Sequence, residues 1–94
     1  MGYKHSRLVA TTDLPFYWIS TVYLPVTVEE WKATESHDFE APMDGRYETI
    51  VFARKLNGDV DMSDDRYVTI NYNQDLAFKD HQLLVNDARE GAFD

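Results

Sequence analysis

The chain has 94 residues, of which 17 are Asp or Glu and nine are Lys or Arg, so its formal net charge is −8 at pH 7. This length predicts a single domain over residues 1–94. The acidic surplus disfavours direct binding to nucleic acid or to an anionic membrane through bulk charge. The absence of cysteine excludes disulfides, thiolate zinc sites, iron–sulfur clusters and cysteine nucleophiles.

The N-terminal residues 1–13 are expected to form a flexible tail. Gly2 and Ser6 have the spacing of an N-myristoylation pattern, but a single acyl chain anchors a protein only marginally without a basic cluster. No apolar run approaches the ~20 residues of a membrane span, and the N-terminus lacks the hydrophobic stretch of a signal peptide. The sequence therefore predicts a soluble protein of the cytoplasm.

Residues 16–24 predict the first β-strand, because nearly all of them are aromatic or β-branched and Pro15 and Pro25 bracket the run. Both faces of this strand would be largely apolar, so both are expected to contact protein, either the core or a partner chain.

A long acidic connection is expected over residues 25–45. Thr27 and Glu30 fit the two ends of a capping box, which favours a short helix over residues 28–34. Residues 33–45 show no periodicity. Long connections of this kind in small domains are often functional or mobile.

The clearest local signal is a β-hairpin around Asn57-Gly58, which is typical of a type I′ turn. Residues 46–54 form its first strand. Counting outward from a two-residue loop places Arg54 opposite Asp61. Residues 63–65 are expected to interrupt the second strand as a turn or bulge, after which residues 66–72 resume the β alternation.

The C-terminal segment changes to a helical period, with an amphipathic helix predicted over residues 74–90. Asn73 can cap its N-terminus and Gly91 its C-terminus. The predicted fold class is therefore α+β, with an antiparallel sheet of three or four strands and one C-terminal amphipathic helix packed on one face.

Four short segments resemble a family of small, uncharacterised proteins of tailed phages and prophages. Members typically read S-T-V-aromatic-L, F-E-T-M-V-F, R-Y-x-T and A-x-x-x-H in that order, and the match spans residues 19–90 in pieces. The family has no established biochemical activity, so the resemblance implies a phage origin and a set of shared positions. These positions are Ser20, Thr21, Glu48, Thr49, Arg66, Tyr67, Ala77 and His81.

The chain departs from that pattern after the first motif. Family members continue with Gly-Leu-Asp-His, whereas this chain has Pro25 to Val28, and their next connection is shorter. Any role of that Asp-His pair therefore does not transfer to this chain.

Glu48, Arg66 and His81 allow two interpretations. They could converge on one polar site, where a His–carboxylate pair is suited to acid–base work. Alternatively, Glu48 is paired with a neighbouring arginine, and His81 is a hydrogen-bonded residue on the helical face that meets the sheet. No phosphate-binding glycine loop or nucleophile elbow is present, so the sequence predicts no catalytic residues and no cofactor, and it disfavours an enzyme without excluding one.

A metal site is also not predicted. Residues 59–65 begin like a calcium loop, but Asp64 occupies the position that needs glycine and Ile70 the position that needs a bidentate Glu. A loose divalent-ion site at this acidic turn stays open as an alternative. His5, His37 and His81 lack zinc-ligand spacing.

These observations favour a non-enzymatic accessory protein that binds a host protein in the host cytoplasm, as a possible homodimer or higher oligomer. The chain's 13 aromatic residues (14%) suit an interface or the core. One alternative is an oligomer that sequesters a small polar ligand such as a nucleotide signal; another is an acidic DNA mimic. The candidate ligand or partner surface comprises Thr21, Glu48, Thr49, Arg66, Tyr67, His81, Trp31 and Phe39.

Overall fold

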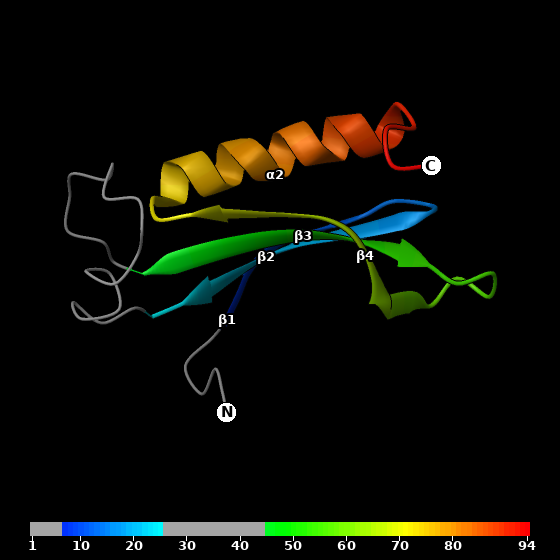
Figure 1. Ribbon diagram of the computed structural model, residues 1–94, viewed down its shortest axis with the longest axis horizontal. Helices are drawn as coiled ribbons and strands as arrows, with labels where there is room; N and C mark the ends of the chain where they lie inside the picture. The colour runs from blue at the N-terminus through cyan, green and yellow to red at the C-terminus, as the bar shows by residue number, and fades with distance from the viewer. Residues whose placement is uncertain (1–6, 26–44) are drawn as a thin grey trace.

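The computed structural model describes residues 7–25 and 45–94, and within them four antiparallel strands form one sheet in the order β1-β2-β3-β4. Figure 1 shows the helix α2 lying along one face of this sheet. The predicted α+β fold class is therefore confirmed. The elements are β1 (Arg7–Asp13), β2 (Tyr17–Leu24), β3 (Arg46–Arg54), β4 (Val60–Asn71) and α2 (Gln74–Arg89).

Strand β1 lies where the sequence predicted a flexible tail, so that prediction is wrong for Arg7–Asp13. β1 pairs antiparallel with β2, with Leu8 opposite Val22 and Thr12 opposite Ile19. A central strand with two apolar faces needs a hydrogen-bonded neighbour on each side. β1 supplies one and β3 the other. The predicted helix over residues 28–34 and most of the 25–45 connection lie outside the described residues.

The hairpin between β3 and β4 is present, but its register differs from the predicted one by one residue. Arg54 lies opposite Val60 rather than Asp61. Lys55 N–H donates to the Asp59 carbonyl (2.7 Å), and Gly58 N–H donates to the Lys55 carbonyl (2.9 Å). Gly58 has a φ of 95°, and Asn57 is not in the left-handed region. The loop is therefore a three-residue turn with a glycine bulge, because a type I′ turn needs two residues with positive φ.

Strand β4 continues through the segment where a turn or bulge was predicted. Its pairing with β3 shifts register on both sides of Phe52, which lies opposite Asp65. The interruption is thus a bulge within one continuous strand, and β4 bends there as it approaches the hairpin (Figure 1).

Helix α2 has the predicted caps. The Asn73 side-chain oxygen accepts hydrogen bonds from the N–H groups of Asp75 (2.8 Å) and Leu76 (3.2 Å). Gly91 has a φ of 83° just beyond the helix C-terminus, which suits glycine. This helix is too short and too polar to cross a membrane, and the other described residues form strands, turns and loops.

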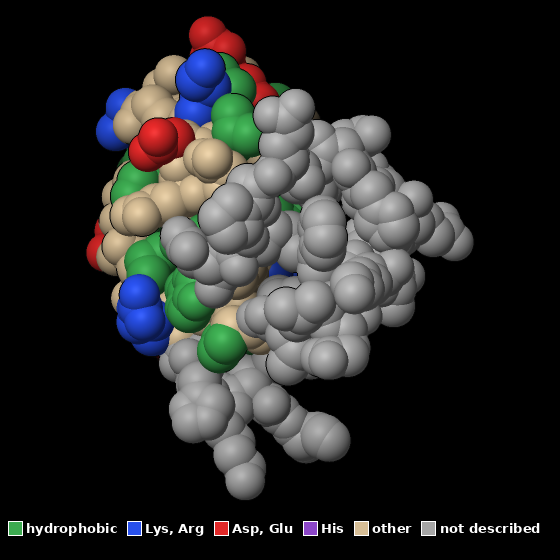
Figure 2. Space-filling view, turned by 90° about the vertical axis from the view of Figure 1, so that its left-hand side faces the viewer, with side chains coloured by type: hydrophobic (Ala, Val, Ile, Leu, Met, Phe, Trp, Pro, Cys, Tyr) green, Lys and Arg blue, Asp and Glu red, His purple; other side chains and the backbone are tan. Residues whose placement is uncertain are grey.

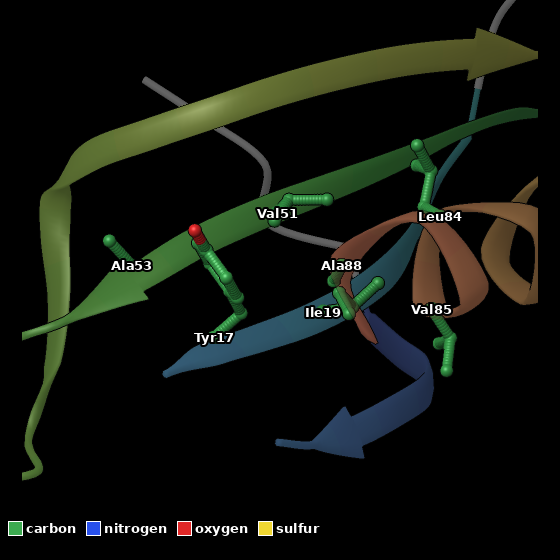
Figure 3. Packing of buried hydrophobic residues seen from close by; sticks show 7 residues of the cluster. All are labelled: Tyr17, Ile19, Val51, Ala53, Leu84, Val85 and Ala88. Atoms are coloured by element: carbon green, nitrogen blue, oxygen red, sulfur yellow. The ribbon is translucent and has the colours of Figure 1, made fainter. Parts of the chain in front are cut away.

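The core forms where α2 meets the middle of the sheet (Figure 3). Ile19 of β2 and Val51 of β3 lie directly opposite each other and are fully buried. Burying such a side chain contributes about 1.5–3 kcal/mol, so the strand pair and the helix stabilise each other. The cluster comprises Tyr17, Ile19, Val51, Ala53, Leu84, Val85 and Ala88.

Candidate functional site

Three residues of the predicted surface, Thr21, Thr49 and His81, meet inside the protein. Thr21 and Thr49 lie opposite each other on β2 and β3, and their Oγ1 atoms are 2.7 Å apart. His81 on α2 places Nδ1 2.8 Å from the Thr21 Oγ1 and Nε2 2.9 Å from the Thr12 Oγ1 of β1. One imidazole therefore joins the helix to two strands, and Thr21 extends the link to a third.

Either neutral tautomer of His81 satisfies this network. One ring nitrogen donates to a threonine oxygen and the other accepts from a threonine hydroxyl, since hydroxyls can take both roles. Burial lowers the pKa of His81 below its ordinary value of 6.5, which favours the neutral ring. The side chain is buried and both nitrogens are occupied, so His81 acts as a structural link rather than as an accessible base.

The suggested convergence of Glu48, Arg66 and His81 does not occur. Glu48 precedes Thr49 on β3, so its side chain points to the other face of the sheet, where it forms an ion pair with Arg46 at 3.0 Å. Arg66 bonds to Asp64 and donates to the Phe93 carbonyl at 2.7 Å. The alternative interpretation, a structural role for each of these residues, is the one that fits the geometry.

The sheet face opposite α2 carries apolar side chains from all four strands, together with polar ones such as Ser20 and Glu48. The strand registers place Leu8 beside Val22, Val22 beside Glu48 and Glu48 beside Ile70 across it. Trp18 and Phe52 stack on this face with ring centroids 6.0 Å apart. We call it the open face and define it by Leu8, Trp18, Val22, Ile50, Phe52, Val68 and Ile70.

On the open face, several large apolar side chains are exposed to solvent. Val68 is 42% and Ile70 50% exposed on β4, and Leu8 is 54% exposed on β1. The Arg46–Glu48 ion pair lies on this face, and the register also places there the pair of Arg54 with Asp13, which is opposite Trp18. This combination of apolar area with a few charges resembles the composition of a protein interface.

A hollow of ≈ 380 Å³ lies on the helix-covered side of the sheet, between α2 and the edge strand β4. Its lining includes Thr69, Asp80 and Asp87, and the two aspartates lie two turns apart on one flank of α2. Asn71 Nδ2 donates to the Asp80 carboxylate at 2.8 Å. The other lining residues are Tyr67, Leu83, Leu84 and Phe93.

The chain that follows α2 forms one wall of this hollow. Arg66 holds the Phe93 carbonyl, and the Tyr17 hydroxyl donates to the Asp94 carboxylate. The Phe93 ring packs against two tyrosines, with its centroid 5.9 Å from that of Tyr67 and 6.1 Å from that of Tyr17. Arg66 thus positions a wall residue instead of lining the hollow itself.

The acidic side chains of residues 59–65, most of which belong to β4, bond to residues close to them in the sequence. The Asp61 carboxylate accepts from the Ser63 hydroxyl (2.6 Å) and backbone, which lowers the pKa of Asp61. Asp64 pairs with Arg66. Within residues 7–25 and 45–94, no group of three potential ligands is arranged to hold a metal ion.

Charged side chains are interspersed on the described surface that Figure 2 shows. Acidic and basic groups alternate there with hydrophobic ones, and no continuous acidic strip crosses the coloured part of this view. A phosphate mimic would need such a strip.

Of the remaining predicted site residues, Tyr67 lines the hollow, whereas Trp31 and Phe39 lie outside the described residues. The sequence interpretation missed Asp80, Asp87 and Phe93. The signal for Asp80 and Asp87 was present in the helical spacing, because acids seven residues apart share one flank of a helix beside its apolar stripe; Phe93 follows the helix, so this spacing does not locate it. Comparison of this chain with protein-family models, curated proteins and solved structures gives no match.

Proposed function

We propose that the protein is a small non-enzymatic accessory protein of the tailed-phage kind that binds a host protein through its open face. The observation that carries this proposal is the exposure of Val68 and Ile70, at 42% and 50%, on the sheet face that α2 leaves uncovered. Neighbouring apolar side chains exposed on one face are typical of protein-binding surfaces.

The composition of the open face supports a protein partner. Trp18 is half-buried and its ring stacks on that of Phe52, which is buried, so Trp18 is the aromatic side chain of this pair that a partner can contact; aromatic residues contribute strongly at interface centres. The Arg46–Glu48 ion pair adds a polar element that can fix the orientation of a partner. A sheet hydrogen-bonded from β1 to β4 would need little rearrangement to present these groups.

A nucleotide-sequestering function has less support from this geometry. The residues suggested for it were Arg66, Tyr67, Thr49 and His81, and they do not share one cavity. Thr49 and His81 are buried in the core, and the hollow beside Tyr67 carries two carboxylates. An anionic ligand would be repelled there.

The test is affinity capture from host lysate with the full chain and a double variant, Val68→Lys and Ile70→Lys. Both sites lie on the exposed edge strand, so the fold should tolerate lysine, while two buried charges in an interface should weaken capture at least about tenfold. Leu76→Lys is the matched control, because Leu76 is 45% exposed on α2, away from the open face.

Three results would count against the proposal. Equal capture by the double variant would show that the open face is not the binding surface. Equal loss with Leu76→Lys would show that the effect is not local to that face. A homodimer that the double variant converts to monomer, measured by light scattering on the pure protein, would replace host binding with self-association.

A further inference from the structure

We infer that the hollow between α2 and β4 binds a small organic cation, an ammonium or guanidinium group on an apolar stem. This site lies across the sheet from the open face and does not depend on the function proposed for that face. Its volume of ≈ 380 Å³ falls in the range of small-molecule sites, about 300–1,000 Å³.

The charged residues that line the hollow favour a cationic ligand over an anionic one. Asp80 and Asp87 both line it from α2, and none of the described residues that line it is Lys, Arg or His. Asn71 donates to Asp80, whereas no hydrogen bond to the Asp87 side chain is found among the described residues. The two carboxylates therefore retain acceptor positions for a cation, and the net charge of −8 attracts one from a distance.

The remaining lining suits the stem of such a ligand. Leu83 and Leu84 supply apolar surface from α2, and Tyr67 of β4 and Phe93 of the chain after α2 supply aromatic rings whose centroids are 5.9 Å apart. Aromatic faces attract cations through their quadrupole, and they also pack against alkyl and aryl groups. Carboxylates and aromatic rings in the lining of one hollow are the groups expected for recognition of an amine.

The aromatic wall is held in place before any ligand binds. Arg66 fixes the Phe93 carbonyl at 2.7 Å, and the Ala92 N–H donates to the Asp87 carbonyl at 3.0 Å. A wall fixed by hydrogen bonds costs little further ordering on binding. Free amines and the lysine side chain of a partner protein share the required chemistry, so the experiment has an arm for each.

The experiment is a titration of the full ¹⁵N-labelled chain, followed by amide chemical shifts. Phenethylammonium represents a free amine and Nα-acetyl-lysine amide represents a protein side chain. Phenethyl alcohol and phenylacetate match the first probe in shape but are neutral and anionic. We expect saturable shifts at Thr69, Leu83 and Phe93 with the cations, with a Kd of about 1 mM, and at least about tenfold weaker binding of the alcohol.

Substitutions in the lining localise the effect. Asp80→Asn and Asp87→Asn should each weaken binding several-fold and together about tenfold, since two partly exposed carboxylates are removed. Asp75→Asn is the matched control, because it makes the same change on α2 outside the hollow. Tyr67→Leu should also weaken binding while keeping an apolar side chain.

The cationic probe with the lower Kd shows whether the natural ligand is a free amine or the lysine side chain of a partner protein. The inference is wrong if the alcohol or phenylacetate binds as tightly as phenethylammonium, or if the double variant binds like the wild type. It is also wrong if no saturable shift occurs up to about 10 mM of either cation. Amide spectra of the free variants show whether each one folds, so a loss of binding is not confused with unfolding.

Discussion

A row of three threonines crosses the sheet beneath α2 and allows one substitution to be compared at three sites. Thr21 of β2 lies opposite Thr49 of β3, and Thr49 lies opposite Thr69 of β4. Thr→Val keeps the β-branched shape and removes only the hydroxyl. The three variants therefore differ mainly in the hydrogen bonds that each hydroxyl makes.

The structure predicts a graded loss of stability along this row. Thr21→Val removes bonds to both Thr49 and His81 and leaves a buried ring nitrogen unpaired, which should cost about 3 kcal/mol. Thr49→Val removes one bond, at a cost of about 1 kcal/mol. Thr69 Oγ1 is buried without a hydrogen-bond partner among the described residues, so Thr69→Val should change stability by less than about 0.5 kcal/mol or be stabilising.

The assay is urea unfolding near pH 8, where His81 is neutral, followed by far-UV circular dichroism. Free energies are compared at a common denaturant slope. Adding His81→Leu to Thr21→Val completes a double-mutant cycle, and we expect the cost of Thr21→Val to fall by at least about 1 kcal/mol in that background. Equal costs at Thr21 and Thr69, or strict additivity with His81→Leu, would refute this hydrogen-bond network.

Three further predictions concern pH and packing. The pKa of His81 is lowered in the folded state from 6.5, so the unfolded chain binds the proton first; unfolding free energy should be constant above about pH 6.5 and fall below it, and His81→Leu should remove this component in urea titrations. Gly45→Ala should cost about 2 kcal/mol in thermal denaturation, because its Cβ would lie 2.5 Å from the Tyr23 Cε1 and 2.7 Å from the Leu24 carbonyl oxygen; an unchanged Tm would contradict this contact. Val51→Ala should cost about 2 kcal/mol of unfolding free energy by urea denaturation, because Val51 is fully buried against α2, and a cost below about 0.5 kcal/mol would place it outside the core.

The elements predicted correctly from sequence are those whose signals are local. β2, β3 and α2 follow from runs of β-branched and aromatic residues, from helical periodicity and from the Asn73 cap. The hairpin turn was located by Asn57-Gly58, but its register was not. Whether the loop contains two or three residues depends on the φ of Asn57, and Asn-Gly is compatible with either.

β1 was missed because its stability comes from a partner rather than from its own sequence. Its seven residues begin with Arg7, end with Asp13 and include two adjacent threonines, so β1 has no long apolar face. Pairing with β2 and the bond from Thr12 to His81 fix it in place. These contacts join β1 to residues far away in the sequence, so the pattern of residues 7–13 alone does not predict them.

The alternation of side chains along a β-strand explains why Glu48 does not lie beside His81. Glu48 and Thr49 are neighbours in sequence, and therefore their side chains point to opposite faces of β3. The period of two could have predicted that a histidine on the covering helix meets only one of them. It could not have predicted which one, because that depends on the face that α2 covers.

The buried polar row also explains how a small sheet keeps one register. A slip of one residue between β2 and β3 would replace Thr49 opposite Thr21 with Glu48 or Ile50, as β3 turns its other face toward α2. Thr21 would lose its hydroxyl partner and a charge or an ill-fitting side chain would enter the core. Because His81 bonds both Thr12 and Thr21, a slip of β1 would likewise leave a buried ring nitrogen unpaired. The network thus penalises shifted pairings by several kcal/mol, on the order of 1–3 per unpaired group, whereas an apolar row would discriminate less sharply between neighbouring registers.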